Sequence, residues 1–109
     1  MSDFMIQYIN RFKNRFLQAI ERLLQNPLPN SILHELQLTR ARRVVNAANV
    51  IIAMGPNAVH VDVEKFETWR TILMMNNMAF NRTEREMSDQ AYNPPQPVSQ
   101  PPPKPMRRR

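Results

Sequence analysis

The sequence predicts an all-α protein, built as a three-helix unit with an extended, proline-rich and basic C-terminal tail. Three apolar periods of helical spacing run through its first part and are separated by two strong helix breaks. The chain of 109 residues contains one glycine, Gly55, which is too few for the many tight reversals of a β-sandwich or barrel. We expect one helical domain at 1–92 and a tail at 93–109.

The first helix is predicted at 3–25. Ser2 or Asp3 can cap its N-terminus, because both side chains accept hydrogen bonds from unpaired backbone N–H groups. Apolar residues then recur at steps of three or four from Met5 to Leu23. The prolines of the following NPLPN segment end the helix, since each one disfavours helical backbone in the residue before it.

The second helix is predicted at 31–54, with Ser31 as its cap. Met54-Gly55-Pro56 is a strong stop, because glycine accepts a positive φ and proline cannot continue the helix. Its last part, 44–54, is apolar nearly all round, which is typical of a helix buried on several sides.

The segment NAVHVDV alternates valine with polar residues, as strands do. Because it is short and alone, we expect an extended connector that tucks Val59, Val61 and Val63 against the helices. A third helix is predicted at 63–81, capped by Asp62. The polar segment after Phe80 either extends this helix or forms a short solvated one.

Motifs for catalysis or for cofactor binding are missing from the sequence. It has no cysteine, two histidines far apart and no glycine-rich phosphate loop, so we expect no enzyme, no metal site and no cofactor. No run of 18 apolar residues exists, and the N-terminus lacks the order of a signal peptide. We therefore expect a soluble, intracellular protein without a membrane partner.

The net charge of +6 comes mainly from 12 arginines, which favour bidentate contacts with phosphate or carboxylate. They either form solvated faces that keep the protein soluble, or contact acidic surfaces of a neighbouring subunit or nucleic acid. Base-stacking aromatic residues are not interleaved with them, which favours the protein partner. The expected basic contact residues are Arg11, Arg15, Arg22, Arg40, Arg42, Arg43, Arg107, Arg108 and Arg109.

Apolar surface suggests that the protein works inside a hetero-complex. The stretch 44–54 and the methionines at 74, 75 and 78 present more apolar surface than a three-helix unit of this size covers by itself. Methionine clusters, however, more often fill cores than line partner grooves. The residues expected in the core or in the interface with other subunits are Phe12, Phe16, Ile51, Ile52, Trp69 and Leu73.

The tail ends in PPPKPMRRR, where prolines favour an extended chain and the arginines bury nothing. It contains two PxxP arrangements, and KPMRRR is similar to a minimal nuclear import signal. Recognition by a partner or an import receptor therefore stands beside the simpler interpretation of a solubilising end.

The opening MSDFMIQYINRFKNRFLQAIERLLQN, the Met- and Asn-rich centre and the PPPKPMRRR ending resemble the small twelve-kilodalton baculovirus family associated with viral nucleocapsids and nuclear actin. This resemblance lies in chain length, local composition and the order of the elements, so it implies no site residues. It implies a structural adaptor in the virion and the host nucleus, contacts with nucleocapsid proteins and a part in nuclear actin accumulation. A small basic nucleic-acid-binding or packaging protein is the alternative.

Overall fold

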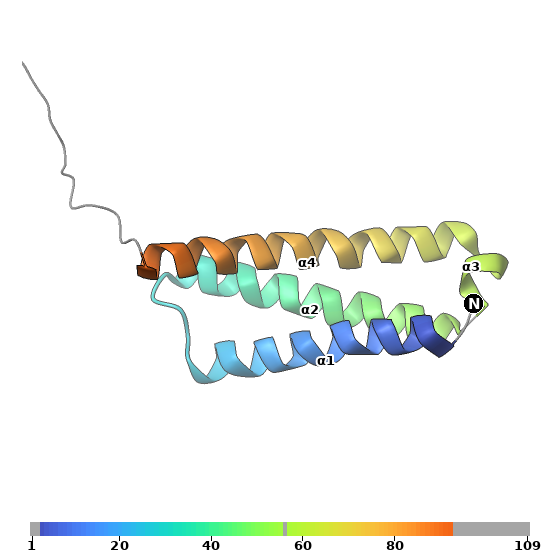
Figure 1. Ribbon diagram of the computed structural model, residues 1–109, viewed down its shortest axis with the longest axis horizontal. Coiled ribbons are helices and arrows are strands. Elements are labelled where there is room, and N and C mark those ends of the chain that lie inside the picture. Colours follow the sequence, from blue (N-terminus) through green and yellow to red (C-terminus); the bar gives the residue numbers. More distant parts are fainter. Residues whose placement is uncertain (1–2, 56, 93–109) are drawn as a thin grey trace, which may run out of the picture.

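The computed structural model describes residues 3–55 and 57–92, and it is all-α with three long helices, as the sequence predicts (Figure 1). The long helices run up, down and up, so α1 and α4 point in the same direction and α2 is antiparallel to both (Figure 1). The predicted tail, 93–109, lies outside the described residues. The helices are α1 (Asp3–Gln25), α2 (Ser31–Met54), the short α3 (Ala58–Val61) and α4 (Val63–Tyr92).

The cap of α2 is Asn30 and not Ser31, which is the first helical residue. The Asn30 side-chain oxygen accepts a hydrogen bond of 3.0 Å from the backbone N–H of Leu33. Asparagine and serine cap helices about equally well, so the sequence does not decide which of these two neighbouring residues is the cap. The geometry of the loop decides it. At the other end Gly55 has a φ of 88° and donates its N–H to the carbonyl oxygen of Ile52, at 3.1 Å. The expected positive φ is therefore confirmed.

The expected extended connector at 57–63 is wrong, because the chain forms the short helix α3 there. The carbonyl oxygen of Asn57 accepts hydrogen bonds from the backbone N–H groups of His60 and Val61, at 2.9 and 3.0 Å. No strand lies nearby in the described structure to pair with this segment, so local bonds satisfy its backbone instead. Val61 and Val63 are exposed and do not tuck against the helices.

The last helix, α4, is longer than the predicted 63–81, since the polar segment extends it to Tyr92. Asp62 caps it as expected, accepting a hydrogen bond of 3.2 Å from the backbone N–H of Lys65. Beyond Phe80 the helix still packs, because Thr83 is buried and Met87 is half-buried. These contacts with the body of the protein favour one continuous helix over a separate solvated one.

The core lies between α2 and its two neighbours, and its largest fully buried side chains are Phe16, Ile51, Leu73, Gln37 and Val44. The sequence suggested that three helices would leave part of the apolar stretch 44–54 uncovered, but the structure covers it. Four of its residues are buried, and its other large apolar side chains are half-buried. The small volumes of Ala47 and Ala48 let α2 approach the other helices closely, so three helices suffice to cover it.

Candidate functional site: an apolar groove between α1 and α4

Helices α1 and α4 touch each other differently from the way both touch α2. The central helix packs closely against both, whereas α1 and α4 meet through long side chains. The rings of Phe16 and Phe80 pack edge to face, with centroids 5.0 Å apart. Beside them, Arg15 Nη2 donates to Asn81 Oδ1 at 3.0 Å. These contacts join the two helices near the middle of the molecule.

Toward the N-terminal ends of α1 and α4, the two helices leave a hollow of about 350 Å³ between them. We call it the α1–α4 groove. Its volume falls within the usual range for small-ligand sites, and its walls are mainly apolar and aromatic. The groove is lined by Met5, Tyr8, Ile9, Phe12, Phe66, Arg70, Leu73 and Met74.

The α1 wall of the groove is aromatic. The rings of Tyr8 and Phe12 meet edge to face, with centroids 5.0 Å apart. The same two residues, together with Arg11 and Arg15, line a second hollow of about 240 Å³, so the depression continues along α1. Phe4 lies one turn before Tyr8 on the same face and is 66% exposed. The groove therefore opens onto aromatic surface.

The α4 wall carries methionine. Met74 lines the groove and packs against the core, and Met78 lies one turn further along the same face and is 58% exposed. The interpretation of the methionines as core filling thus applies to Met74 but not to Met75 or Met78, which are both exposed. Flexible methionine side chains adapt to partners of different shape.

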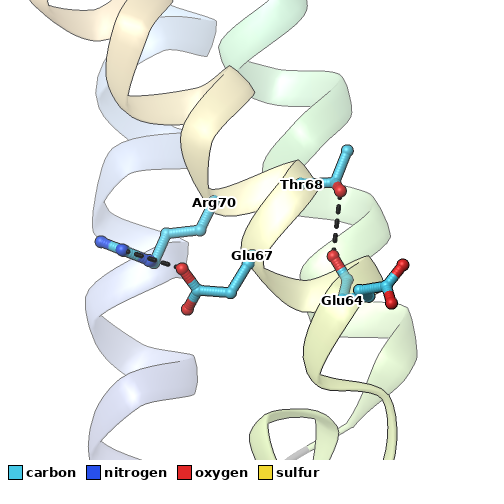
Figure 2. A network of polar contacts seen from close by, with 4 residues as sticks. All are labelled: Glu64, Glu67, Thr68 and Arg70. Carbon is cyan, nitrogen blue, oxygen red and sulfur yellow. Dashed lines mark hydrogen bonds and ion pairs between the residues drawn. The ribbon is translucent and has the colours of Figure 1, made fainter.

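Three arginines border this apolar surface, namely Arg11, Arg15 and Arg70. Arg70 Nη2 lies 3.2 Å from Glu67 Oε1, and both side chains are about half exposed. Figure 2 shows this pair on one side of α4, while the Thr68 hydroxyl bonds to the backbone carbonyl of Glu64 on another. An exposed pair of this kind contributes little stability, so Arg70 can exchange Glu67 for another carboxylate.

The six residues predicted for the core or interface take different places. Phe16, Ile51 and Leu73 are each 1% exposed and belong to the core of this chain. Phe12, Ile52 and Trp69 are half-buried and pack against that core. Within this set, Phe12 and Leu73 line the groove.

The predicted run of arginines on α2 does not form one surface. Arg40 is half-buried, and its Nη1 donates to Gln37 Oε1 at 2.7 Å and to Thr83 Oγ1 at 2.8 Å. Gln37 is itself fully buried and donates through Nε2 to the carbonyl oxygen of Phe80, at 3.2 Å. Arg40 thus helps to join α2 to α4, whereas Arg42 and Arg43 are exposed.

The remaining predicted basic residues lie on α1 or in the tail. Arg11, Arg15 and Arg22 are exposed on α1, along the flank that also carries Phe4 and Tyr8. The three arginines at 107–109 lie outside the described residues.

Several residues of the groove were not predicted as contacts from the sequence, among them Met5, Tyr8 and Arg70. Met74 belongs to the methionine cluster for which core filling and a partner groove were both considered. A signal was present in α1, where Phe4, Tyr8, Arg11 and Arg15 recur at steps of three and four beside the main apolar stripe. The two stripes together are too wide for one packed face, which indicates a helix with two contact surfaces.

Two other classes of site were considered for the described residues. Across 3–55 and 57–92, no three histidine, cysteine or acidic side chains come together as a metal site would require. None of the helices described has the length and apolar character needed to cross a membrane. Comparisons of the chain with protein-family models, with curated proteins and with solved structures found no match.

Proposed function

We propose that this protein is a non-enzymatic structural adaptor that holds a partner protein in the α1–α4 groove, within a hetero-complex. The observation that carries the proposal is an apolar hollow of about 350 Å³ that opens onto exposed aromatic and methionine side chains. Contiguous apolar surface of this kind is typical of interaction sites on small proteins. Ile9, Phe66 and Leu73 at the base of the groove belong to the core. The exposed side chains around it, such as Phe4, Tyr8 and Met78, lie outside that core.

The setting that we propose is a nucleocapsid-associated complex in the virion and the host nucleus, with nucleocapsid proteins as partners and a link to nuclear actin. Its support is the resemblance of the chain's ends and centre to the twelve-kilodalton baculovirus family, together with the tail's KPMRRR segment. The groove supports the adaptor role independently of that setting, because the adaptor role requires only a partner with a complementary apolar surface.

The test compares substitutions at two consecutive residues of α4. Met74 lines the groove, while Met75 is turned about 100° away from it and is exposed. Tagged protein is recovered from producing cells, and the co-purifying subunits are identified and quantified. We expect Met74→Glu to lose its partner and Met75→Glu to keep it.

A second groove variant guards against a folding defect at the half-buried Met74 position. Tyr8 is 50% exposed, so Tyr8→Glu places a charge in the groove with little effect on the core. Thermal unfolding followed by circular dichroism checks that each variant is folded. Recovery of the same partners by well-folded Met74→Glu and Tyr8→Glu would refute the proposal.

Nucleic-acid binding is the second candidate, favoured by the exposed arginines along one flank of α1. An adaptor of the proposed kind binds duplex DNA weakly at physiological ionic strength. A packaging protein instead binds tightly, and its affinity falls steeply with added salt because each neutralised phosphate releases counterions. A salt titration of the purified full chain by fluorescence anisotropy therefore separates the two functions.

A further inference from the structure

We infer that the occupant of the α1–α4 groove is an amphipathic α-helix of a partner protein, with acidic residues on the flank of its apolar stripe that faces α1. This inference rests on the proposed adaptor function and adds the chemistry and geometry of the partner. Three features of the structure lead to it: the arrangement of the long helices, the length of the groove and the charges along its borders.

The arrangement of the helices resembles three corners of a four-helix bundle. In such a bundle each helix packs closely against two neighbours and faces the remaining one across the core. Here α2 packs closely against both α1 and α4, while α1 and α4 reach each other through long side chains such as Phe16 and Phe80. The groove lies between α1 and α4, where the fourth corner would be. A helix placed there would contact both of them.

The length of the groove sets the size of the occupant. Along α1 the two hollows extend from Met5 to Arg15, which corresponds to about 15 Å at 1.5 Å per residue. A helix of about three turns covers this distance, with apolar side chains at i, i+3 or i+4, and i+7. Helices this short are marginal in isolation, so the segment would become ordered as it binds.

The charges along the groove determine what flanks that apolar stripe. Arg11 and Arg15 border it on the α1 side, and Arg70 borders it on the α4 side. Among the described residues, the one ion pair made by these arginines is that of Arg70 with Glu67, while Arg15 bonds to the neutral Asn81. Positive charge therefore predominates on the α1 border, whereas Glu67 balances Arg70 on the α4 border. Carboxylates on the flank of the docked helix that faces α1 would complement this charge.

The chain's own segments are poor candidates for this position. The tail, 93–109, contains Lys104 and three arginines but no acidic residue, and its prolines disfavour a helix. On α4, the exposed Met75 and Met78 are followed by Arg82 at helical spacing. A second copy would thus bring arginine against the arginines of the groove, which is unfavourable.

The test uses a displayed library of helical peptides about fourteen residues long, presented to the purified full-length protein. Leucine is fixed along the apolar stripe, and both flanks are randomised among glutamate, lysine, glutamine and serine. We expect selection to enrich glutamate on one flank, the flank that faces Arg11 and Arg15. A selected peptide should bind about tenfold more tightly than its counterpart with lysine in place of glutamate, as measured by fluorescence anisotropy.

Charge-reversal variants show where the peptide binds. Arg11→Glu with Arg15→Glu should shift the selected residues on that flank toward lysine. The matched control is Arg42→Glu with Arg43→Glu, which changes the net charge equally at exposed positions of α2 that do not line the groove. This control should leave the glutamate preference unchanged, and Met74→Glu should abolish binding of the selected peptide.

Several results would overturn the inference. These are a selection that yields no binder, bound peptides without a charge preference, or a preference that the groove variants leave unaltered. A dimer in sedimentation equilibrium that Met74→Glu dissociates would identify a second copy as the occupant, and peptide binding that appears only after deletion of 93–109 would identify the tail. The adaptor proposal is judged separately, by partner recovery with Met74→Glu and Met75→Glu.

Discussion

Phe4 and Phe16 lie on the same helix but in opposite environments. Phe16 is 1% exposed and packs edge to face against Phe80, whereas Phe4 is 66% exposed near the groove. We expect Phe16→Ala to lower the free energy of unfolding by about 3–5 kcal/mol, because it removes the transfer energy of the ring and leaves a cavity. Urea unfolding followed by circular dichroism measures the change.

The control for this prediction is Phe4→Ala, which makes the same chemical change on the surface. It should alter the free energy of unfolding by less than about 0.5 kcal/mol. Equal losses in the two variants would show that Phe4 is also part of the folded core.

Gln37 shows why a core cannot be read completely from apolar spacing. Glutamine is usually exposed, yet this side chain is fully buried and bonds to the carbonyl oxygen of Phe80 and to Arg40. Its burial depends on Phe80, which is 43 residues away on α4, and on Arg40, which lies one turn further along α2 and itself bonds to Thr83 of α4. No local pattern encodes such a pairing, so the sequence predicted Arg40 as a surface contact rather than as part of this cluster.

At the scale of the elements, the cap of α2 gives a direct test of local structure. We expect Asn30→Ala to lower the free energy of unfolding by about 1 kcal/mol, because the backbone N–H of Leu33 loses its side-chain acceptor. The change is read from the denaturation midpoint at constant slope. Asn26→Ala, in the same loop but outside the cap, is the matched control and should have a smaller effect.

The three long helices could be predicted because their apolar periods are long and their ends carry strong signals, such as the NPLPN segment and Gly55. The short helix α3 could not be predicted, since its alternating valines fit a strand, and no strand among residues 3–55 and 57–92 is present to pair with it. The end of α4 likewise depended on support from α2, which buries Thr83.

The groove was harder to predict than the helices, for a physical reason. Met5 and Met74 belong to helices that are separated by the whole of α2, and the hollow between them follows from how α1 and α4 are placed. Apolar residues that line such a hollow have the same spacing as residues of the core. The sequence therefore located apolar faces but did not show which of them another helix would leave uncovered.

At the scale of the whole molecule, we expect deletion of 93–109 to leave the thermal midpoint nearly unchanged. Every apolar residue of the described core lies between Ile9 and Phe80, so the deletion removes none of them. Differential scanning fluorimetry of the full and shortened chains provides the comparison.

The same deletion should impair nuclear accumulation, because it removes KPMRRR. Microscopy of tagged chains measures this, with a chain that retains the prolines but ends in three serines as the control. A shortened chain that unfolds, or that localises as the full chain does, would show that the tail has another role.

The bond between Arg15 and Asn81 spans 66 residues of the chain, more than the 43 that separate Gln37 from Phe80, and this has a consequence for folding kinetics. Once α2 has paired with α1 and with α4, the contacts between α1 and α4 close with little further loss of chain entropy. We therefore expect them to form after the transition state. In stopped-flow measurements, Phe80→Leu should accelerate unfolding and leave the folding rate nearly unchanged. The side of the molecule that carries the groove would then be the last to assemble and the first to open.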